Sequence, residues 1–307
     1  MTQFRPADAA ERLRGGDERR LALGSMTVQH ASFGDRVAAA AAAGLRCIGY
    51  HHRHYRRDVR SGATDADLVA AAAAHGIEVV EVESVHGVLE ADPDGRTSRF
   101  VDEMLRMVDV FGARRVIVHS GFDGDVDRAA ARFARLCDRA AEHAVAVGLE
   151  FVPWTTLPDL RTVLDIVRAA GCANGGVVLD TWHFFRGDGD VAALSELRPG
   201  ELVAVQLTDG VPEPRLDPLV ETLTRRCPPG DGIFPLAQLV DALAHAEVPW
   251  SIEVICPDLD RLPVEEAVRR CVTACTSLLA GWSGRTADER VRATAVRGRR
   301  SSARQER

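Results

Sequence analysis

Two stretches, AAAAAAGLRCIGY (residues 38–50) and AAAAHGIEVVEV (residues 71–82), decide the fold. Each begins with an alanine-rich segment typical of a helix, passes through a glycine that can adopt the left-handed helix cap, and ends in a short apolar strand pattern. The same order recurs at FGARRVIVHS, AVAVGLEFV and AAGCANGGVVLD, and more loosely at LRPGELVAVQL and AEVPWSIEVI. The chain therefore repeats one unit, a helix followed by a strand.

With the opening LALGSMTV, this repetition predicts eight strands, near residues 21–28, 46–51, 78–84, 115–119, 148–152, 176–180, 202–207 and 250–254. Helices between successive strands imply right-handed crossovers and a parallel sheet, and eight such units match a (β/α)8 TIM barrel. A doubly wound open sheet is the alternative, but no GxGxxG follows the first strand. We expect an N-terminal arm (1–20), a barrel domain (21–282) and an Arg-rich flexible tail (283–307).

Composition places the chain among soluble globular proteins, with 46% hydrophobic and 27% charged residues among 307. No apolar run approaches the roughly 20 residues of a membrane span, and the N-terminus lacks the apolar core of a signal peptide. We therefore expect a cytoplasmic protein with no membrane partner. The seven cysteines form no CxxC pair, which predicts reduced thiols rather than a disulfide framework.

The charged residues exclude several function classes. The sequence has no lysine, so all 38 Lys+Arg residues are arginine, and lysine-dependent chemistry such as Schiff-base catalysis or a P-loop is excluded. From Gly284 onward, eight arginines and three acidic residues give a net charge of +5, which leaves −12 on the rest of the chain. An acidic body argues against nucleic-acid binding.

Polar side chains end four consecutive predicted strands, in the segments LEF, VLD, VQL and IEV. Because side chains alternate between the lumen and the helix layer, Glu150, Asp180, Gln206 and Glu253 would point into the barrel while their apolar neighbours point outward. Neighbouring strands lie about 4.8 Å apart, so the four groups can converge at the C-terminal mouth, where barrels carry their chemistry.

Three carboxylates held this close would repel one another without a cation, so the pattern predicts a divalent metal site. Oxygen ligands favour Mn²⁺ or Mg²⁺, with Co²⁺ or Zn²⁺ also accepted. Taken singly, a strand-end glutamate is often solvated or caps a helix, and a buried glutamine often only satisfies backbone groups. The four together favour metal binding.

The segments LEFVPW, VVLDTWH, VAVQLTDG, RCPPGDG and WSIEV, in this order, resemble the xylose isomerase-like TIM barrel superfamily, the sugar phosphate isomerase/epimerase (AP endonuclease 2-type) family. The resemblance covers residues 20–280. It implies that Glu150, Asp180, Gln206 and Glu253 are metal ligands, that His183 contacts substrate oxygen, and that Arg226 faces an anionic or hydroxylated substrate. His86 and Trp154 are further candidate substrate contacts.

Departures from the family pattern narrow the function. Sugar 3-epimerases of this superfamily commonly have histidine where this chain has Gln206, and its DNA-repair endonucleases carry a D-x-H pair that this chain lacks. Gln206 instead resembles the ligand set of 3-dehydroshikimate dehydratases. We therefore expect a metal-dependent isomerase or epimerase first, a lyase of the dehydratase type second and a non-catalytic barrel used as a binding module third.

The expected partner is a small carbohydrate-like molecule. The sequence leaves open whether the chain forms a homo-oligomer. Glu150 and Glu253 would take and return a proton beside a metal-bound carbonyl, and His183 would protonate a leaving hydroxyl if elimination followed. Tyr50, His51 and His119 are weaker site candidates. We interpret HHRHYRR (51–57) as a solvated loop, and PPGDG (228–232) as a turn whose N–H groups could hold phosphate.

Overall fold

The computed structural model describes residues 21–187, 189–212, 216–243 and 249–283, and it is a closed eight-stranded parallel barrel. The strand order around the barrel is β1-β10-β7-β6-β5-β4-β3-β2. The barrel strands are β1 (Leu21–Leu23), β2 (Cys47–His51), β3 (Glu78–His86), β4 (Arg115–His119), β5 (Ala146–Glu150), β6 (Gly175–Asp180), β7 (Leu202–Leu207) and β10 (Trp250–Ile252). The predicted (β/α)8 barrel and its eight strands are thus confirmed.

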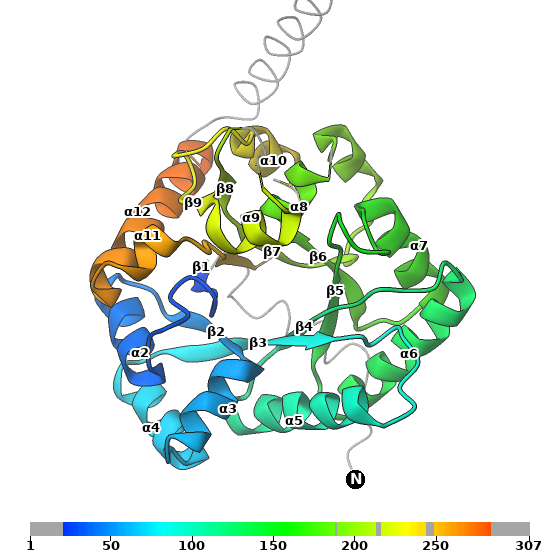
Figure 1. Ribbon diagram of the computed structural model, residues 1–307, viewed down its shortest axis with the longest axis horizontal. Helices are drawn as coiled ribbons and strands as arrows, with labels where there is room; N and C mark the ends of the chain where they lie inside the picture. The colour runs from blue at the N-terminus through cyan, green and yellow to red at the C-terminus, as the bar shows by residue number, and fades with distance from the viewer. Residues whose placement is uncertain (1–20, 188, 213–215, 244–248, 284–307) are drawn as a thin grey trace, which may run out of the picture.

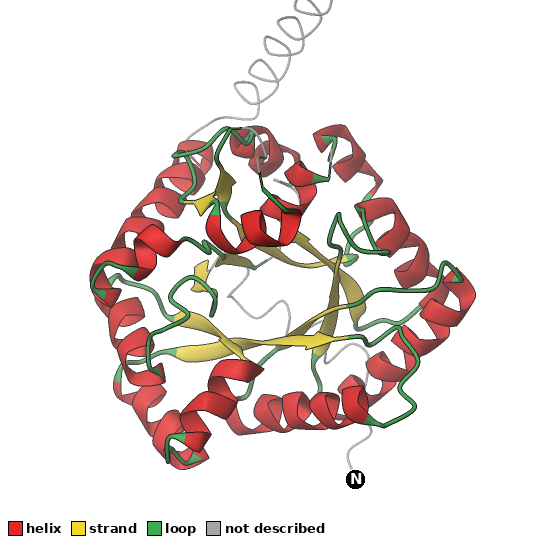
Figure 2. Ribbon diagram, in the orientation of Figure 1, coloured by secondary structure: helices red, strands yellow, loops and turns green. Residues whose placement is uncertain are grey.

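A ring of helices surrounds the strands (Figures 1 and 2). Its members are α2 (Phe33–Ala42), α4 (Asp65–Ala74), α5 (Arg96–Phe111), α6 (Val126–Glu142), α7 (Leu160–Ala170), α10 (Leu236–Ala242) and α12 (Val264–Ser283). Shorter elements follow the strands: α3 (His52–Arg60), α8 (Thr181–Arg186), η1 (Val191–Glu196), α9 (Pro218–Thr224), α11 (Pro257–Asp260) and the two-stranded pair β8 (Asp209–Gly210) and β9 (Arg226–Cys227).

Local sequence explains where the helices begin and end. Asp125 caps α6 by accepting from Arg128 N, and Thr64 and Asp67 form a capping box at α4. The α7 helix ends at Gly171, whose φ of 64° is the left-handed cap. The expected arm (1–20) and most of the expected tail lie outside the described residues, while Ser283 is the last residue of α12.

The first and last strands are shorter than predicted. Strand β1 ends at Leu23, and β10 ends at Ile252. Thr27 replaces the missing ladder bonds, because its hydroxyl donates to Ile252 O and accepts from Val254 N. Glu253 consequently lies just beyond its strand, but still two residues after Ser251, which pairs with Gln206 in the register.

The predicted alternation of side chains is confirmed. The seven apolar residues expected to face outward all belong to the buried cluster between strands and helices: Leu149, Phe151, Leu179, Val205, Leu207, Ile252 and Val254. Small separate clusters, such as Ile117 with Val178 and Ala204, fill the barrel interior. No disulfide joins the cysteines, all seven of which lie in the described ranges. Among the described helices, none is long and apolar enough to cross a membrane.

Gly148 shows how tightly the interior is packed. A Cβ at this position would lie 2.3 Å from Val178 Cγ2, and the branched valine has little freedom to move away. We expect Gly148→Ala to lower the free energy of unfolding by about 1–3 kcal/mol. Gly34→Ala, in α2 with only Ser32 Oγ at 3.9 Å, is the matched control and should leave the melting temperature unchanged or slightly higher. Equal melting temperatures for the two variants would contradict this packing.

Candidate active site

The four predicted ligands lie at the C-terminal mouth of the barrel. Glu150 and Asp180 are the last residues of β5 and β6, Gln206 is on β7, and Glu253 directly follows β10. Asp180 pairs with Gln206 in the register, so these two stand at the same height. Asp180, Gln206 and Glu253 are buried, and the Glu150 side chain is 12% exposed.

The tightest cluster combines Glu150 and Asp180 with His183, whose potential ligand atoms all lie within 4.8 Å of one another. His183 Nε2 is 3.6 Å from Glu150 Oε1 and 3.7 Å from Asp180 Oδ2. Asp180 caps α8 by accepting from Trp182 N, and one helical turn then places His183 beside it. His183, predicted to contact substrate, therefore also stands where a metal ligand could.

Three buried polar atoms at the mouth have no hydrogen-bond partner among the described residues. They are Gln206 Oε1, Glu253 Oε2 and His183 Nδ1. An unpaired buried polar group costs about 1–3 kcal/mol, so a structure rarely keeps one without a use. Two of these three atoms are oxygens of the predicted ligand set, which fits a site built to bind a hard cation.

The pKa values of the carboxyl groups reflect their crowding. Burial raises the pKa of Glu150 and Glu253 well above the usual range; the Asp180 charge adds to the effect on Glu150, and the Glu83 charge adds to the effect on Glu253. Burial also raises the pKa of Asp180, which the Arg226 guanidinium partly opposes. The pKa of His183 is lowered well below its usual value by burial and then by Arg226, which keeps the imidazole neutral.

The buried charges at the mouth do not balance. Two neighbouring pairs are neutral in themselves, Glu81 with Arg115 (2.9 Å) and Asp58 with Arg57 (3.2 Å). Six further groups at the mouth act on one another electrostatically, four carboxylates and two guanidinium groups: Glu83, Glu150, Asp180, Glu253, Arg36 and Arg226. Fully ionised, they carry a net charge of −2, which one divalent cation would neutralise.

Arg226 begins β9 and is almost fully buried. Its Nη1 donates to Asp180 Oδ2 at 2.6 Å and to the Glu253 carbonyl at 3.2 Å, and its Nε donates to Thr222 O. The guanidinium therefore joins two of the predicted ligand positions. Its predicted contact with substrate stays a prediction, because these bonds show the residue engaged with the protein.

The other predicted contacts lie around the same mouth. The Trp154 ring meets His183 edge-on, with ring centroids 5.1 Å apart, and forms part of the wall. His86 ends β3, is exposed and lies 4.7 Å from the His119 ring. His119 Nδ1 shares a 2.5 Å hydrogen bond with Ser84 Oγ, and burial lowers the pKa of His119 to about 4.

Two of the weaker site candidates, Tyr50 and His51, form contacts that stabilise the fold. Tyr50 lies in the helix layer, where its hydroxyl donates to Asp58 and its ring packs on Phe33. The HHRHYRR segment is not a solvated loop, because residues from His52 onward form α3. One face of that helix is buried, with His54 bonded to Ser25 Oγ, and His51 Nδ1 caps its first turn.

The glycine-rich turn after β9 is held by Asp209 rather than open to phosphate. The buried carboxylate accepts the N–H groups of Gly210, Gly230 and Phe234 at 2.8–2.9 Å. A Cβ on Gly232 would lie 2.3 Å from Asp209 Oδ1, so only glycine permits this approach. Within the turn, Asp209 takes the Gly230 N–H and the Pro228 carbonyl takes the Asp231 N–H, so these two groups are already used inside the protein.

Glu83 on β3 is a buried site carboxylate that sequence reasoning missed. Burial and the neighbouring Glu81 raise its pKa to about 8. Its Oε2 accepts from Gln206 Nε2 at 3.4 Å. The alternation of Glu81, Val82 and Glu83 is the same signal that identified Glu150, and it could have placed both glutamates in the lumen.

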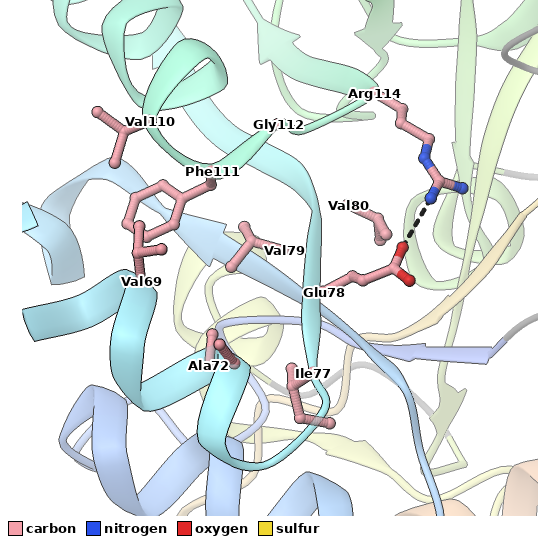
Figure 3. Close-up of a pocket in the computed structure, with 11 residues that line it drawn as sticks. Val69, Ala72, Ile77, Glu78, Val79, Val80, Val110, Phe111, Gly112 and Arg114 are labelled. Atoms are coloured by element: carbon pink, nitrogen blue, oxygen red, sulfur yellow. Dashed lines mark hydrogen bonds and ion pairs between the residues drawn. The ribbon is translucent and has the colours of Figure 1, made fainter. Parts of the chain in front are cut away.

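A cavity of about 190 Å³ opens between α4 and α5, at the other end of β3 from the mouth (Figure 3). Its lining is mostly apolar, with Val79 and Phe111 among the residues, and the Arg114–Glu78 ion pair (2.6 Å) stands at its edge. It holds none of the residues of the cluster at the mouth. The candidate active site is therefore the mouth itself.

Comparison with known proteins agrees with this fold. The family model described as xylose isomerase-like TIM barrel matches residues 37–274. A curated relative, the 3-dehydroshikimate dehydratase of Pseudomonas aeruginosa, is 30% identical over 167 residues, which are 52% of this chain and 26% of that protein. The chain thus spans about a quarter of the length of this relative.

Two solved structures share the fold. The IolI protein with a bound zinc atom has a TM-score of 0.77 at 19% identity, covering 85% of this chain and 98% of that one. The D-psicose 3-epimerase of Clostridium cellulolyticum, solved with D-tagatose, has a TM-score of 0.64 at 14% identity, with 85% and 98% covered. At these identities the likeness shows the fold alone.

The ion pair between Arg226 and Asp180 should stabilise the metal-free protein. Arg226→Met leaves the buried Asp180 carboxylate without an ion-pair partner, so we expect the free energy of unfolding to fall by about 3–5 kcal/mol. Arg128→Met, which removes ion pairs to Asp123 and Asp125 from an exposed side chain, is the control and should change the melting temperature little. Calorimetric melting of both variants tests this. Similar losses in the two would contradict the importance of the buried pair.

Proposed function

Because the chain belongs to the xylose isomerase-like TIM barrel family, we propose that it is a divalent-metal-dependent isomerase or epimerase of a sugar or polyol-derived keto compound. The observation that carries the proposal is the pair of carboxyl groups of Glu150, which is 12% exposed, and Glu253, which is buried; they reach the same mouth from β5 and from the end of β10. Two carboxylates on separate strands can serve two faces or two carbons of one substrate.

Glu150, Asp180, Gln206 and Glu253 would hold the metal, with His183 close enough to join them. The unpaired oxygens of Gln206 and Glu253 and the net charge of −2 support this assignment. The oxygen-rich set favours Mn²⁺ or Mg²⁺, while Co²⁺ or Zn²⁺ would also fit. When bound, such an ion supplies Lewis-acid polarisation of a carbonyl oxygen and balances the negative charge that develops there.

The side chains would divide the proton transfer. One glutamate takes the proton from the carbon beside the carbonyl, and the C–H electron pair moves into the carbonyl group. The other glutamate gives a proton back on the opposite face of the same carbon, which is epimerisation. If the proton instead returns to the former carbonyl carbon, and the hydroxyl proton passes from the first carbon's oxygen to the former carbonyl oxygen, the result is isomerisation. His183 is neutral, so it would donate a hydrogen bond to a substrate oxygen, and Trp154 would exclude water on that side.

A lyase of the 3-dehydroshikimate dehydratase type is the second candidate. It is supported by the curated relative of that name and by Gln206, the residue that we associate with that ligand set. The first proton transfer would be the same, but a hydroxyl β to the carbanion would leave with a proton from His183. The nature of the substrate then decides between the two outcomes.

Metal binding is the first test. We expect the wild-type chain to bind about one Mn²⁺, and Asp180→Ala to lose it, because this substitution removes a carboxylate from the centre of the cluster. Glu253→Gln should bind the ion more weakly. Asp258→Asn, an exposed carboxylate on α11, is the control and should bind as the wild type does. Titration calorimetry measures all four, and a wild-type chain that binds no Mn²⁺ would favour the binding-module alternative.

The reaction itself is tested by NMR in D₂O with keto sugars, inosose-like ketones and 3-dehydroshikimate. We expect deuterium to enter the carbon beside the carbonyl of one of these compounds with the Mn²⁺-loaded wild type. Glu253→Gln should slow this exchange by about 10²–10⁴-fold, the usual contribution of a positioned acid or base. An epimer or isomer as product supports the main proposal. Loss of water from the compound, with no deuterium in the ketone that remains unreacted, supports the lyase.

A further inference from the structure

Glu83 lies inside the barrel directly beneath the candidate metal site. It is 3% exposed, and β2 makes room for it, because a Cβ on Gly49 would lie 2.9 Å from Glu83 Oε1. Four hydrogen-bond acceptor positions surround a carboxylate, so a buried one needs donors. The described residues supply two: Ser25 N donates to Oε1 at 3.2 Å, and Gln206 Nε2 donates to Oε2 at 3.4 Å.

The contact with Gln206 fixes which way its amide points. The amide nitrogen is the atom that faces Glu83: Nε2 donates to Oε2 at 3.4 Å, and an ionised carboxylate can only accept this bond. The amide oxygen then points away from Glu83, and that oxygen, Oε1, is buried and has no partner among the described residues. With the amide reversed, the nitrogen would take the place of Oε1 and could not bind a cation.

Glu83 is itself held by a buried network. Ser25, whose N–H donates to Glu83, receives a hydrogen bond on Oγ from Arg36 Nη1 at 3.1 Å and another from His51 N at 2.9 Å. Arg36 is fully buried, and none of the described carboxylates forms an ion pair with it. A buried guanidinium without a paired acid stabilises negative charge nearby, and Glu83 is one of the groups that its charge acts on.

We propose that Glu83 is a positioning residue for the metal site: its carboxylate holds the Gln206 amide so that Oε1 faces the ion. This inference rests on the proposed function, because it requires Gln206 to be a ligand. Glu83 need not touch the ion or the substrate. Its effect passes through one side chain, which makes the inference testable by a double-mutant cycle.

The experiment measures Mn²⁺ dissociation constants for the wild type, Glu83→Gln, Gln206→Ala and the double variant. Loss of a residue that orients a ligand typically weakens metal binding about 10–100-fold, and we expect a loss of this size for Glu83→Gln. In the Gln206→Ala background, Glu83→Gln should cause no further loss. Glu78→Gln, at the opposite end of β3 and paired with Arg114, is the control and should bind as the wild type does.

The possible failures are distinguishable. Unchanged Mn²⁺ binding in Glu83→Gln, with a wild type that binds, overturns the positioning role and leaves the proposed function standing. So does a full, independent loss in the Gln206→Ala background, because Glu83 would then act without Gln206. A wild type that binds no Mn²⁺ overturns both. If Glu83→Gln does not fold by circular dichroism, Glu83→Asp, which retains the charge but is too short for the contact, carries the same cycle.

Discussion

Concentrated negative charge at one end of the barrel is the constraint on which the rest of the site depends. Glu150, Asp180 and Glu253 lie close enough together for their charges to interact, and each has a raised pKa. Without a counter-charge, at least one would have to stay protonated. Arg226 supplies one positive charge at 2.6 Å from Asp180, but the mouth still carries an excess. The divalent cation that we propose would neutralise this excess and give the unpaired oxygens a partner.

The barrel can carry this charge because its strands leave space for it. A Cβ on Gly24 would lie 2.4 Å from Glu253 Oε2 and 2.3 Å from the Ile252 carbonyl, so the residue that follows β1 must be a glycine for Glu253 to enter the mouth. Gly49 does the same for the glutamates of β3. The apolar side chains that alternate with the acids pack under the helices. The burial of these apolar side chains offsets the free-energy cost of placing carboxylates in the interior.

Sequence alone was sufficient for the barrel and for its mouth, because both depend on local periodicity. The repeated helix and strand patterns fix the eight strands, and the alternation of LEF and IEV fixes which way Glu150 and Glu253 point. Contacts between distant strands could not be predicted in this way. Glu83 and Gln206 are 123 positions apart, and their meeting depends on strand order and register. The helix in HHRHYRR was missed because its buried face is polar, with His54 against Ser25.

The state of His183 bears on which side chain at the mouth would supply a proton. Burial and the Arg226 charge keep the imidazole neutral, and its Nδ1 has no partner among the described residues. A neutral imidazole donates a hydrogen bond well, but it is a weaker acid than an imidazolium for driving out a hydroxyl. In an elimination, the leaving hydroxyl would therefore take its proton more easily from a carboxyl group. Glu150, whose Oε1 lies 3.6 Å from His183 Nε2, is placed to supply that proton. Return of a proton to carbon draws on a protonated glutamate in the same way, so the neutral imidazole argues against His183 as the acid of an elimination and leaves the carboxyl groups as proton donors for either reaction.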